Sequence, residues 1–263
     1  MLRRTSEIKG FTFGARDGEI GRAKDFYFDD ESWTVRYLVA DTGKWLALRQ
    51  VLISPHAVRG FRDQDKVIEL DLTKTQIENS PSIDQDRPVS RQFEVDYYRY
   101  YNYPFYWQGA AMWGPLPRPA GSYGQVTGPL QQTWPPSDDR PAGTEASGDP
   151  HLRSTQAVTG YYIQAKDGEI GHVEDFVLND EDWIIDYLVV DTINWWPGKK
   201  VLVSPAWVDS IDWHESKVLV NLEREFIKNA PEYDMSKPIS REYETRLLEY
   251  YGHESYRTNR AAA

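Results

Sequence analysis

The string DGEIG at residues 17–21, followed by YLVADT at residues 37–42, decides how this chain is organised. Nearly the same pair of strings returns 150 positions later, as DGEIG at residues 167–171 and YLVVDT at residues 187–192. Self-similarity at one fixed offset is the signature of a structural repeat. A chain of 263 residues with one long repeat predicts two copies of a single folded module.

Each copy has the pattern of short β-strands joined by tight turns. The pair Asp17-Gly18 is a strong hairpin signal, because a type I′ turn needs positive φ at its central residues. Gly21 marks a bulge or a close backbone approach. Residues 33–40 alternate as a β-strand does, and Pro55, which lacks a backbone N–H, marks the end of a later strand. Short strands at this even spacing predict a small, mostly antiparallel β-barrel.

A helix is predicted after each barrel. Ser90 is the expected N-cap. Phe93, Tyr97, Tyr100 and Tyr101 follow at helical spacing, so they are expected to form one apolar face that packs on its own barrel. Ser240 occupies the same place in the second copy and predicts the same helical extension.

Residues 103–152 differ in composition from both copies. Prolines stand among Gly, Ser and Gln, which is typical of a linker. Trp113 and Trp134 are unusual in a flexible linker, so we expect them to dock, on the same chain in preference to a partner. The predicted organisation is a first module at residues 1–102, a linker at 103–152, a second module at 153–257 and a frayed tail at 258–263.

The DGEIG turn, the YLVVDT strand and the string VLISP at residues 51–55 resemble the PRC-barrel family. The helix after RPVSR at residues 87–91 resembles the extension in bacterial tandem PRC-barrel proteins. That family includes the cytoplasmic domain of the photosynthetic reaction-centre H subunit and the C-terminal domain of a ribosome maturation factor. The resemblance implies two small antiparallel barrels in tandem that hold other macromolecules, and it does not imply catalysis. Within residues 1–263 the resemblance does not extend to a membrane helix like that of the first protein or to a first domain like that of the second, and a fold alone does not fix a function.

Composition excludes several classes of site. The chain has no cysteine, which rules out disulfides, zinc–thiolate centres and thiol nucleophiles. Its net charge is −11, and residues 153–263 carry 12 Lys and Arg against 20 Asp and Glu. Acidic surfaces repel phosphate backbones, so direct nucleic-acid binding is not expected. No apolar run approaches the roughly 20 residues that cross a bilayer, so membrane insertion is not expected either.

Candidate groups for chemistry have simpler interpretations. Asp17 and Glu19 offer a carboxylate pair, but the turn itself accounts for the Asp-Gly pair, so we interpret them as solvated turn residues. The acidic runs at residues 29–31 and 179–182 lack the spacing of an EF-hand loop and leave only weak cation binding open. The five histidines form no pair at metal-ligand spacing. We therefore predict no catalytic residues, cofactor or metal, and a protein that is not an enzyme.

The predicted function is non-enzymatic: an adaptor or assembly module that binds a protein partner through barrel edges and exposed aromatic residues. The alternatives are a peripheral component of a membrane complex of the reaction-centre kind, and a ribosome-associated maturation factor that binds a ribosomal protein. The expected location is the cytoplasm, or the periphery of the inner membrane through a partner. The candidate partner-binding residues are Tyr103, Phe105, Tyr106, Trp107, Trp195, Trp196 and Trp207.

Several matched positions of the two copies carry opposite charges. If the barrels pack about a pseudo-twofold axis, equivalent residues can meet across it and attract. This predicts an internal pseudo-dimer, with ordinary drift of surface charge after duplication as the alternative. The positions, first copy against second, are Lys24 and Glu174, Arg36 and Asp186, Arg62 and Asp212, and Glu78 and Lys228.

Overall fold

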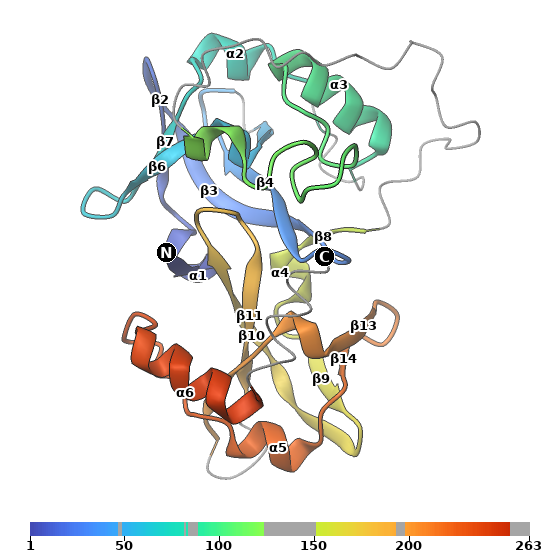
Figure 1. The fold of residues 1–263 in the computed structure, drawn as a ribbon. Coiled ribbons are helices and arrows are strands. Elements are labelled where there is room, and N and C mark those ends of the chain that lie inside the picture. Colours follow the sequence, from blue (N-terminus) through green and yellow to red (C-terminus); the bar gives the residue numbers. More distant parts are fainter. Residues whose placement is uncertain (47–48, 82, 84–88, 124–150, 193–197, 253–263) are drawn as a thin grey trace. The chain divides into compact units, whose positions relative to one another are not determined.

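The computed structural model describes residues 1–46, 49–81, 83, 89–123, 151–192 and 198–252 (Figure 1). The chain divides into two compact units. The N-terminal unit comprises residues 9–153 with residues 181–183, and the C-terminal unit comprises residues 154–180 and 184–263 with residues 1–8.

The N-terminal unit is built on a seven-stranded sheet followed by a helix. Its strands run in the order β5-β4-β3-β2-β7-β6, and β8 pairs with β3. The strands are β2 (Thr12–Ala15), β3 (Gly18–Asp29), β4 (Thr34–Asp41), β5 (Gln50–Ile53), β6 (Val58–Arg62), β7 (Val67–Leu70) and β8 (Leu152–Ser154). The helical elements are η1 (Pro55–Ala57), α2 (Lys74–Glu78), α3 (Arg91–Tyr101) and η2 (Ala120–Tyr123).

The C-terminal unit repeats this plan. Its strands run in the order β12-β11-β10-β9-β14-β13, and β1 pairs with β10. The strands are β1 (Leu2–Arg4), β9 (Tyr162–Ala165), β10 (Gly168–Asn179), β11 (Ile185–Asp191), β12 (Lys200–Val203), β13 (Val208–Asp212) and β14 (Lys217–Val220). The helical elements are α1 (Thr5–Ile8), α4 (Thr155–Val158), η3 (Pro205–Trp207), α5 (Arg224–Asn229) and α6 (Arg241–Tyr251).

The structure confirms a mainly β fold in two units, and it refines the predicted barrels in two ways. Each sheet contains one parallel pair, β2 with β7 and β9 with β14. Parallel pairing arises where strands far apart in the chain meet, because only strands joined by a hairpin must run antiparallel. The described strands form an open path that ends at β5 and β6 in one sheet and at β12 and β13 in the other.

The first strand of each repeat pairs with the long strand of the other repeat. β1 runs antiparallel to β10, and β8 pairs with β3. Equivalent ion pairs fix both strands: Arg3 Nε lies 2.6 Å from Asp180 Oδ2, and Arg153 Nε lies 3.1 Å from Asp30 Oδ2. The predicted first module, residues 1–102, therefore contains a strand that belongs to the C-terminal unit.

Two glycines of the repeated DGEIG string sit where no side chain fits. Gly21 has φ +150°, and a Cβ built on it would lie 2.1 Å from the carbonyl oxygen of Asp41. Gly171 has φ +157° and the same 2.1 Å approach to the carbonyl oxygen of Asp191. The close backbone approach predicted at this glycine is confirmed in both repeats.

The carboxylate of the same string has a structural partner. Asp17 Oδ1 accepts a 2.8 Å hydrogen bond from the backbone N–H of Lys74 at the start of α2. Asp167 Oδ1 accepts the equivalent 2.8 Å bond from Arg224 at the start of α5. Each turn thus anchors the short helix that follows the sheet.

The predicted helical extensions are α3 and α6. Ser90 Oγ accepts a hydrogen bond from Phe93 N and Ser240 Oγ accepts one from Tyr243 N, both at 3.2 Å, so both predicted N-caps are confirmed. The helix α3 places Tyr97, which is 1% exposed, against the sheet, where its hydroxyl donates to the carbonyl of Leu52 at 3.0 Å. None of the described helices combines the length and apolarity needed to cross a membrane.

Candidate functional site

Residues 103–121, called the aromatic segment below, follow α3 and pack into the N-terminal unit. Phe105 and Tyr106 are buried, and Trp113 is completely buried. The structure thus differs from the predicted linker over this stretch, because its aromatic side chains bury enough apolar surface to offset the entropy of ordering it. Trp113 docks on its own chain as expected, while Trp134 lies outside the described residues.

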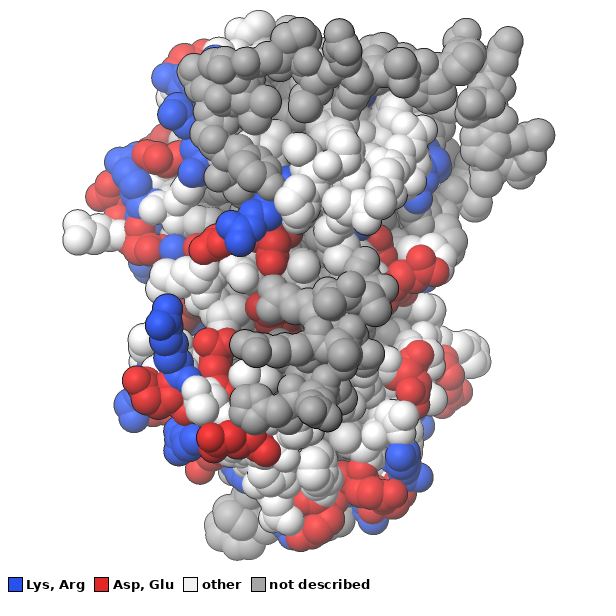
Figure 2. All heavy atoms as spheres, viewed as in Figure 1, with Lys and Arg blue, Asp and Glu red and all other residues white. Residues whose placement is uncertain are grey.

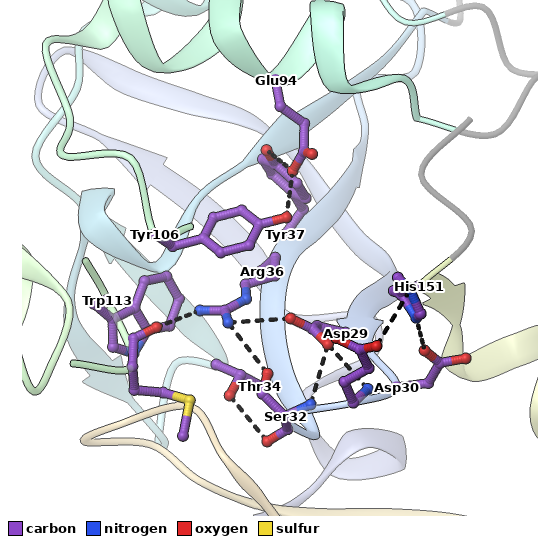
Figure 3. A network of polar contacts seen from close by, with 12 residues as sticks. Asp29, Asp30, Ser32, Thr34, Arg36, Tyr37, Glu94, Tyr106, Trp113 and His151 are labelled. Atoms are coloured by element: carbon purple, nitrogen blue, oxygen red, sulfur yellow. Dashed lines mark hydrogen bonds and ion pairs between the residues drawn. The ribbon is translucent and has the colours of Figure 1, made fainter. Parts of the chain in front are cut away.

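Arg36 of β4 is the main polar anchor of the aromatic segment (Figure 3). The residue is 3% exposed, and its Nη1 donates to the carbonyl of Met112 at 2.7 Å. Its guanidinium carbon lies 3.9 Å from the centre of the Tyr106 ring and 5.1 Å from that of Trp113. The charge is balanced by Asp29, whose Oδ2 lies 3.2 Å from Nη2. A desolvated cation between two rings and a carboxylate is a strong, directional clamp.

Asp29 remains ionised in this environment. Burial alone would raise the pKa of its carboxyl group, but Arg36 and hydrogen bonds from Ser32 outweigh burial, and the pKa is lowered. Asp29 also accepts backbone hydrogen bonds from Glu31 and Ser32, at 3.0 and 3.1 Å. Within the acidic turn at residues 29–31, Asp29 therefore serves Arg36 and the turn's own backbone, while Asp30 pairs with Arg153.

Glu94 of α3 forms a second anchor inside the same unit. Its side chain is fully buried, and Oε1 accepts 2.8 Å hydrogen bonds from the hydroxyls of Tyr37 and Tyr106. Its Oε2 lies 2.9 Å from Nη1 of Arg91. Burial, followed by the Glu94 charge, raises the pKa of both tyrosines, so both hydroxyls stay protonated as donors. Helix, sheet and aromatic segment are tied together at this one carboxylate.

His56 of η1 receives the far end of the aromatic segment. Its Nδ1 accepts a 2.8 Å hydrogen bond from Ala120 N–H, so the ring proton is on Nε2. The ring stacks on Tyr103 at 5.0 Å and meets Trp113 edge-on at 5.1 Å. Burial, and then Arg36, lowers the pKa of His56 to about 3, so the imidazole is neutral at neutral pH.

In the described part of the C-terminal unit, the equivalent surface is more exposed. Residues 55–58 are all buried, whereas none of residues 205–208 is buried and Ala206 is exposed. Tyr98 of α3 is buried beneath the aromatic segment, while its counterpart Leu248 of α6 is half-buried. We call residues 205–208 together with Leu248 the open face.

The predicted partner-binding residues fall into three groups. Phe105 and Tyr106 are interior residues of the N-terminal unit rather than surface contacts, because Arg36 and Glu94 hold the segment that carries them. Tyr103, Trp107 and Trp207 are partly exposed. Trp195 and Trp196 lie outside the described residues.

At least five of the eight charge-swapped positions have partners inside their own units. Arg36 pairs with Asp29, Arg62 Nη1 lies 2.8 Å from Asp65 Oδ2, and Glu174 Oε1 lies 2.9 Å from Lys200 Nζ. Lys228 lies near Glu225 at 3.7 Å, and Asp212 Oδ1 accepts backbone hydrogen bonds from His214 and Glu215. Lys24 and Glu78 are exposed and Asp186 is buried. Their meeting across a pseudo-twofold axis stays a prediction.

One group of possible metal ligands occurs among the described residues. Atoms of His172, Glu174 and Asp191 lie within 4.8 Å of one another in the C-terminal unit. Lys200 Nζ lies 2.9 Å from Glu174 and 3.1 Å from Asp191, so an ammonium group already offsets part of the negative charge of these two carboxylates. A metal ion would compete with that lysine.

Sequence reasoning missed the buried polar network of Arg36, Glu94 and Tyr106. Differences between the repeats carried a signal for it, since Arg36 and His56 stand opposite Asp186 and Ala206. A cation and an imidazole stand at these positions in the first copy and not in the second. This difference indicates that an additional segment packs on the first copy.

No protein-family model matches this sequence, and no curated protein matches it.

Proposed function

We propose that this protein is a non-enzymatic adaptor or assembly module that binds an aromatic segment of a protein partner. The observation that supports this best is the way the N-terminal unit holds residues 103–121. That stretch has no strand and only one short 3-10 element, yet it buries Trp113 completely. The unit therefore has the features of a receptor for an irregular, aromatic polypeptide.

The residues that hold the aromatic segment are of the types that dominate protein–protein interfaces. Buried Trp and Tyr anchors with a desolvated arginine dominate the binding energy of many complexes. Arg36 donates to a backbone carbonyl, which fixes the position of a chain whatever its neighbouring side chains are. Arg36, Glu94 and the Nδ1 of His56 are engaged in holding the segment, which favours binding over catalysis.

Two further features support the proposal. The resemblance to PRC-barrels implies a small β fold that holds other macromolecules. Figure 2 shows Lys and Arg side chains interspersed with Asp and Glu over the described part of the visible face, with no continuous basic patch there. A protein partner fits this surface better than a phosphate backbone does.

The test is affinity purification of the full tagged chain from gently solubilised cells, with partners identified and quantified by mass spectrometry. We expect one partner at close to equimolar amount, which co-migrates with the purified chain in size-exclusion chromatography. Subunits of a membrane complex would favour a reaction-centre-like role, and ribosomal proteins would favour a maturation role. A clean preparation without a stoichiometric partner would count against an adaptor.

A further inference from the structure

We propose that the open face of the C-terminal unit binds a segment of a partner protein that inserts an aromatic side chain and carries Lys or Arg beside it. This inference rests on the proposed function and names the surface and the chemistry of the partner. The starting observation is that one molecule contains the same surface twice, buried in one copy and partly exposed in the other.

The backbone of the two surfaces is the same. Ser54 caps η1 with φ −70° and ψ 145°, and Ser204 caps η3 with φ −73° and ψ 141°. Both serines accept a 3.3 Å hydrogen bond from the N–H two residues on. The difference in exposure between residues 55–58 and 205–208 therefore does not come from the capping geometry; it reflects their different side chains and what packs on them.

The covered copy shows how closely a polypeptide can approach this surface. A Cβ built on Gly121 would lie 2.2 Å from the carbonyl oxygen of Val58 and 2.9 Å from that of His56. Tyr98 contacts the rings of Phe105 and Trp107, with centroids at 6.2 and 5.5 Å. The surface thus accepts a backbone at close range on one side and an aromatic cluster on the other.

The uncovered copy has become more apolar at its surface. Trp207 stands where the first repeat has Ala57, and Phe226 stands where it has Gln76. The partly exposed Trp207 ring lies 4.2 Å from Tyr251, which lies 5.5 Å from Phe226, so a buried tyrosine links these two rings. Phe226 is 37% exposed. Exposed aromatic side chains grouped around a buried ring are typical of an interaction site.

The charges beside the open face are reversed as well. Asp209 and Asp212 stand where the first repeat has Arg59 and Arg62. Asp209 is exposed, and residues 153–263 carry 12 basic against 20 acidic residues. A partner segment with Lys or Arg next to its aromatic anchor complements this rim, whereas an acidic segment is repelled.

The chain supplies its own probe for the test. A fluorescent peptide with the sequence of residues 103–121 has the required aromatic spacing, and the same peptide with Gln108→Lys and Ala111→Lys adds the required charge. Binding to the full chain is measured by fluorescence anisotropy at low and high salt. We expect the lysine peptide to bind more tightly than the unmodified one, by about threefold to fivefold at low salt, with the difference shrinking as salt screens the rim charges.

Three variants of the protein locate the site. Ala206→Arg places a bulky cation on an exposed position of the open face and should weaken the lysine peptide about tenfold or more. Asp209→Lys should remove the preference for the lysine peptide. Glu242→Lys changes an exposed charge at the start of α6 and is the matched control, which should bind as the wild type does. Circular dichroism and melting confirm that each variant is folded.

The outcomes separate the inference from the proposed function. A photo-crosslinking form of the lysine peptide should label residues 205–212 rather than 55–62. Equal binding by wild type and Ala206→Arg, labelling elsewhere, or no binding at all would overturn the inference. Binding that appears only in a chain shortened to end at Gly252 would show that the protein's own tail covers the face, and would overturn it too. The proposed function stands or falls separately, on whether the wild-type chain retains a stoichiometric partner in the purification.

Discussion

His56 and Ala206 occupy equivalent positions, and they differ in burial and hydrogen bonding because the aromatic segment packs on His56. A histidine under a covering segment is desolvated. Its Nδ1 accepts a hydrogen bond from the Ala120 N–H, while its buried Nε2 has no hydrogen-bond partner among the described residues. An alanine at the same place in the other repeat is exposed and needs no partner. The neutral imidazole is therefore part of the packing of the segment.

The pH dependence of stability should report on His56. Its pKa is about 3 in the folded protein and about 6.5 in an unfolded chain, so between these values the unfolded state binds more protons. Stability is therefore lost as pH falls from about 6.5 towards 3, by about 1.4 kcal/mol per pH unit from this residue. His56→Gln keeps an acceptor and removes the titration. We expect the difference in unfolding free energy between wild type and His56→Gln, measured by urea denaturation, to change by about 1.4 kcal/mol per pH unit between pH 6 and 4.5.

His214→Gln is the matched control, because His214 is exposed. Its unfolding curves should follow those of the wild type at every pH. Parallel pH profiles for wild type and His56→Gln would contradict a neutral, buried His56.

Gly21 of the repeated DGEIG string offers a second quantitative test, of its close backbone approach to Asp41. Gly21→Ala places a methyl group 2.1 Å from the Asp41 carbonyl oxygen at a φ that alanine rarely adopts. We expect a loss of roughly 2 kcal/mol or more in the free energy of unfolding. Gly60→Ala, where no atom lies within 4 Å of the added Cβ, should stay within about 1 kcal/mol of wild type. Equal effects of the two changes in denaturant titrations would refute the close approach.

At the scale of elements, the aromatic segment is the part of the molecule that departs furthest from its sequence pattern. It lacks the periodicity of a helix or strand and is rich in Pro and Gly, yet it is a packed layer of the N-terminal unit. Its stability comes from side chains on β4, η1 and α3, which are far apart in sequence. Pattern and spacing predicted the strands and the Ser90 and Ser240 caps, because those depend on local geometry. The hairpin at Asp17-Gly18 is present, but Asp17 does not have the positive φ that the predicted type I′ turn requires at both central residues.

The Arg36 and Glu94 clamps were not predictable, since nothing local places a strand arginine beside Met112 or a helix glutamate beside Tyr106. The parallel pairing of β2 with β7 depends on the same kind of long-range closure. The added Trp207 is a partial signal for the open face in the sequence. The contrast in burial with the first copy depends on long-range packing of the aromatic segment, which local patterns do not predict.

Trp113 should be the side chain on which the docking of the aromatic segment depends. It is completely buried, and its indole N–H donates to the carbonyl of Asp182 at 2.9 Å within the N-terminal unit. Trp113→Ala should cost about 3 to 5 kcal/mol of unfolding free energy. Trp107→Ala, which removes a partly exposed ring stacked on Phe105, should cost clearly less. Chemical denaturation measures both, and equal losses would show that the segment is held elsewhere.

For the whole molecule, the exchange of first strands makes each repeat incomplete. Thr5 Oγ1 donates to the buried carboxylate of Asp175 at 2.6 Å, and Ser6 also donates to it. Without residues 1–8 the C-terminal unit therefore loses both a sheet strand and the donors that satisfy a buried charge. The two repeats exchange their first strands, so the topology predicts that the second repeat does not fold independently of the first.

Fragment complementation tests this coupling directly. The fragment 1–123 carries β1 and lacks β8, and the fragment 151–263 carries β8 and lacks β1, so each should melt early alone and the equimolar mixture should melt later and more cooperatively. A synthetic peptide of residues 1–8 should raise the Tm of the fragment 151–263, because a ligand that binds only the folded state stabilises it by mass action. The same peptide with Arg3→Asp is the control, since it reverses one charge of the 2.6 Å pair with Asp180 and should raise the Tm far less. If the fragment 151–263 melts at the same temperature with and without the peptide, β1 contributes nothing to that unit and the strand exchange does not couple the repeats.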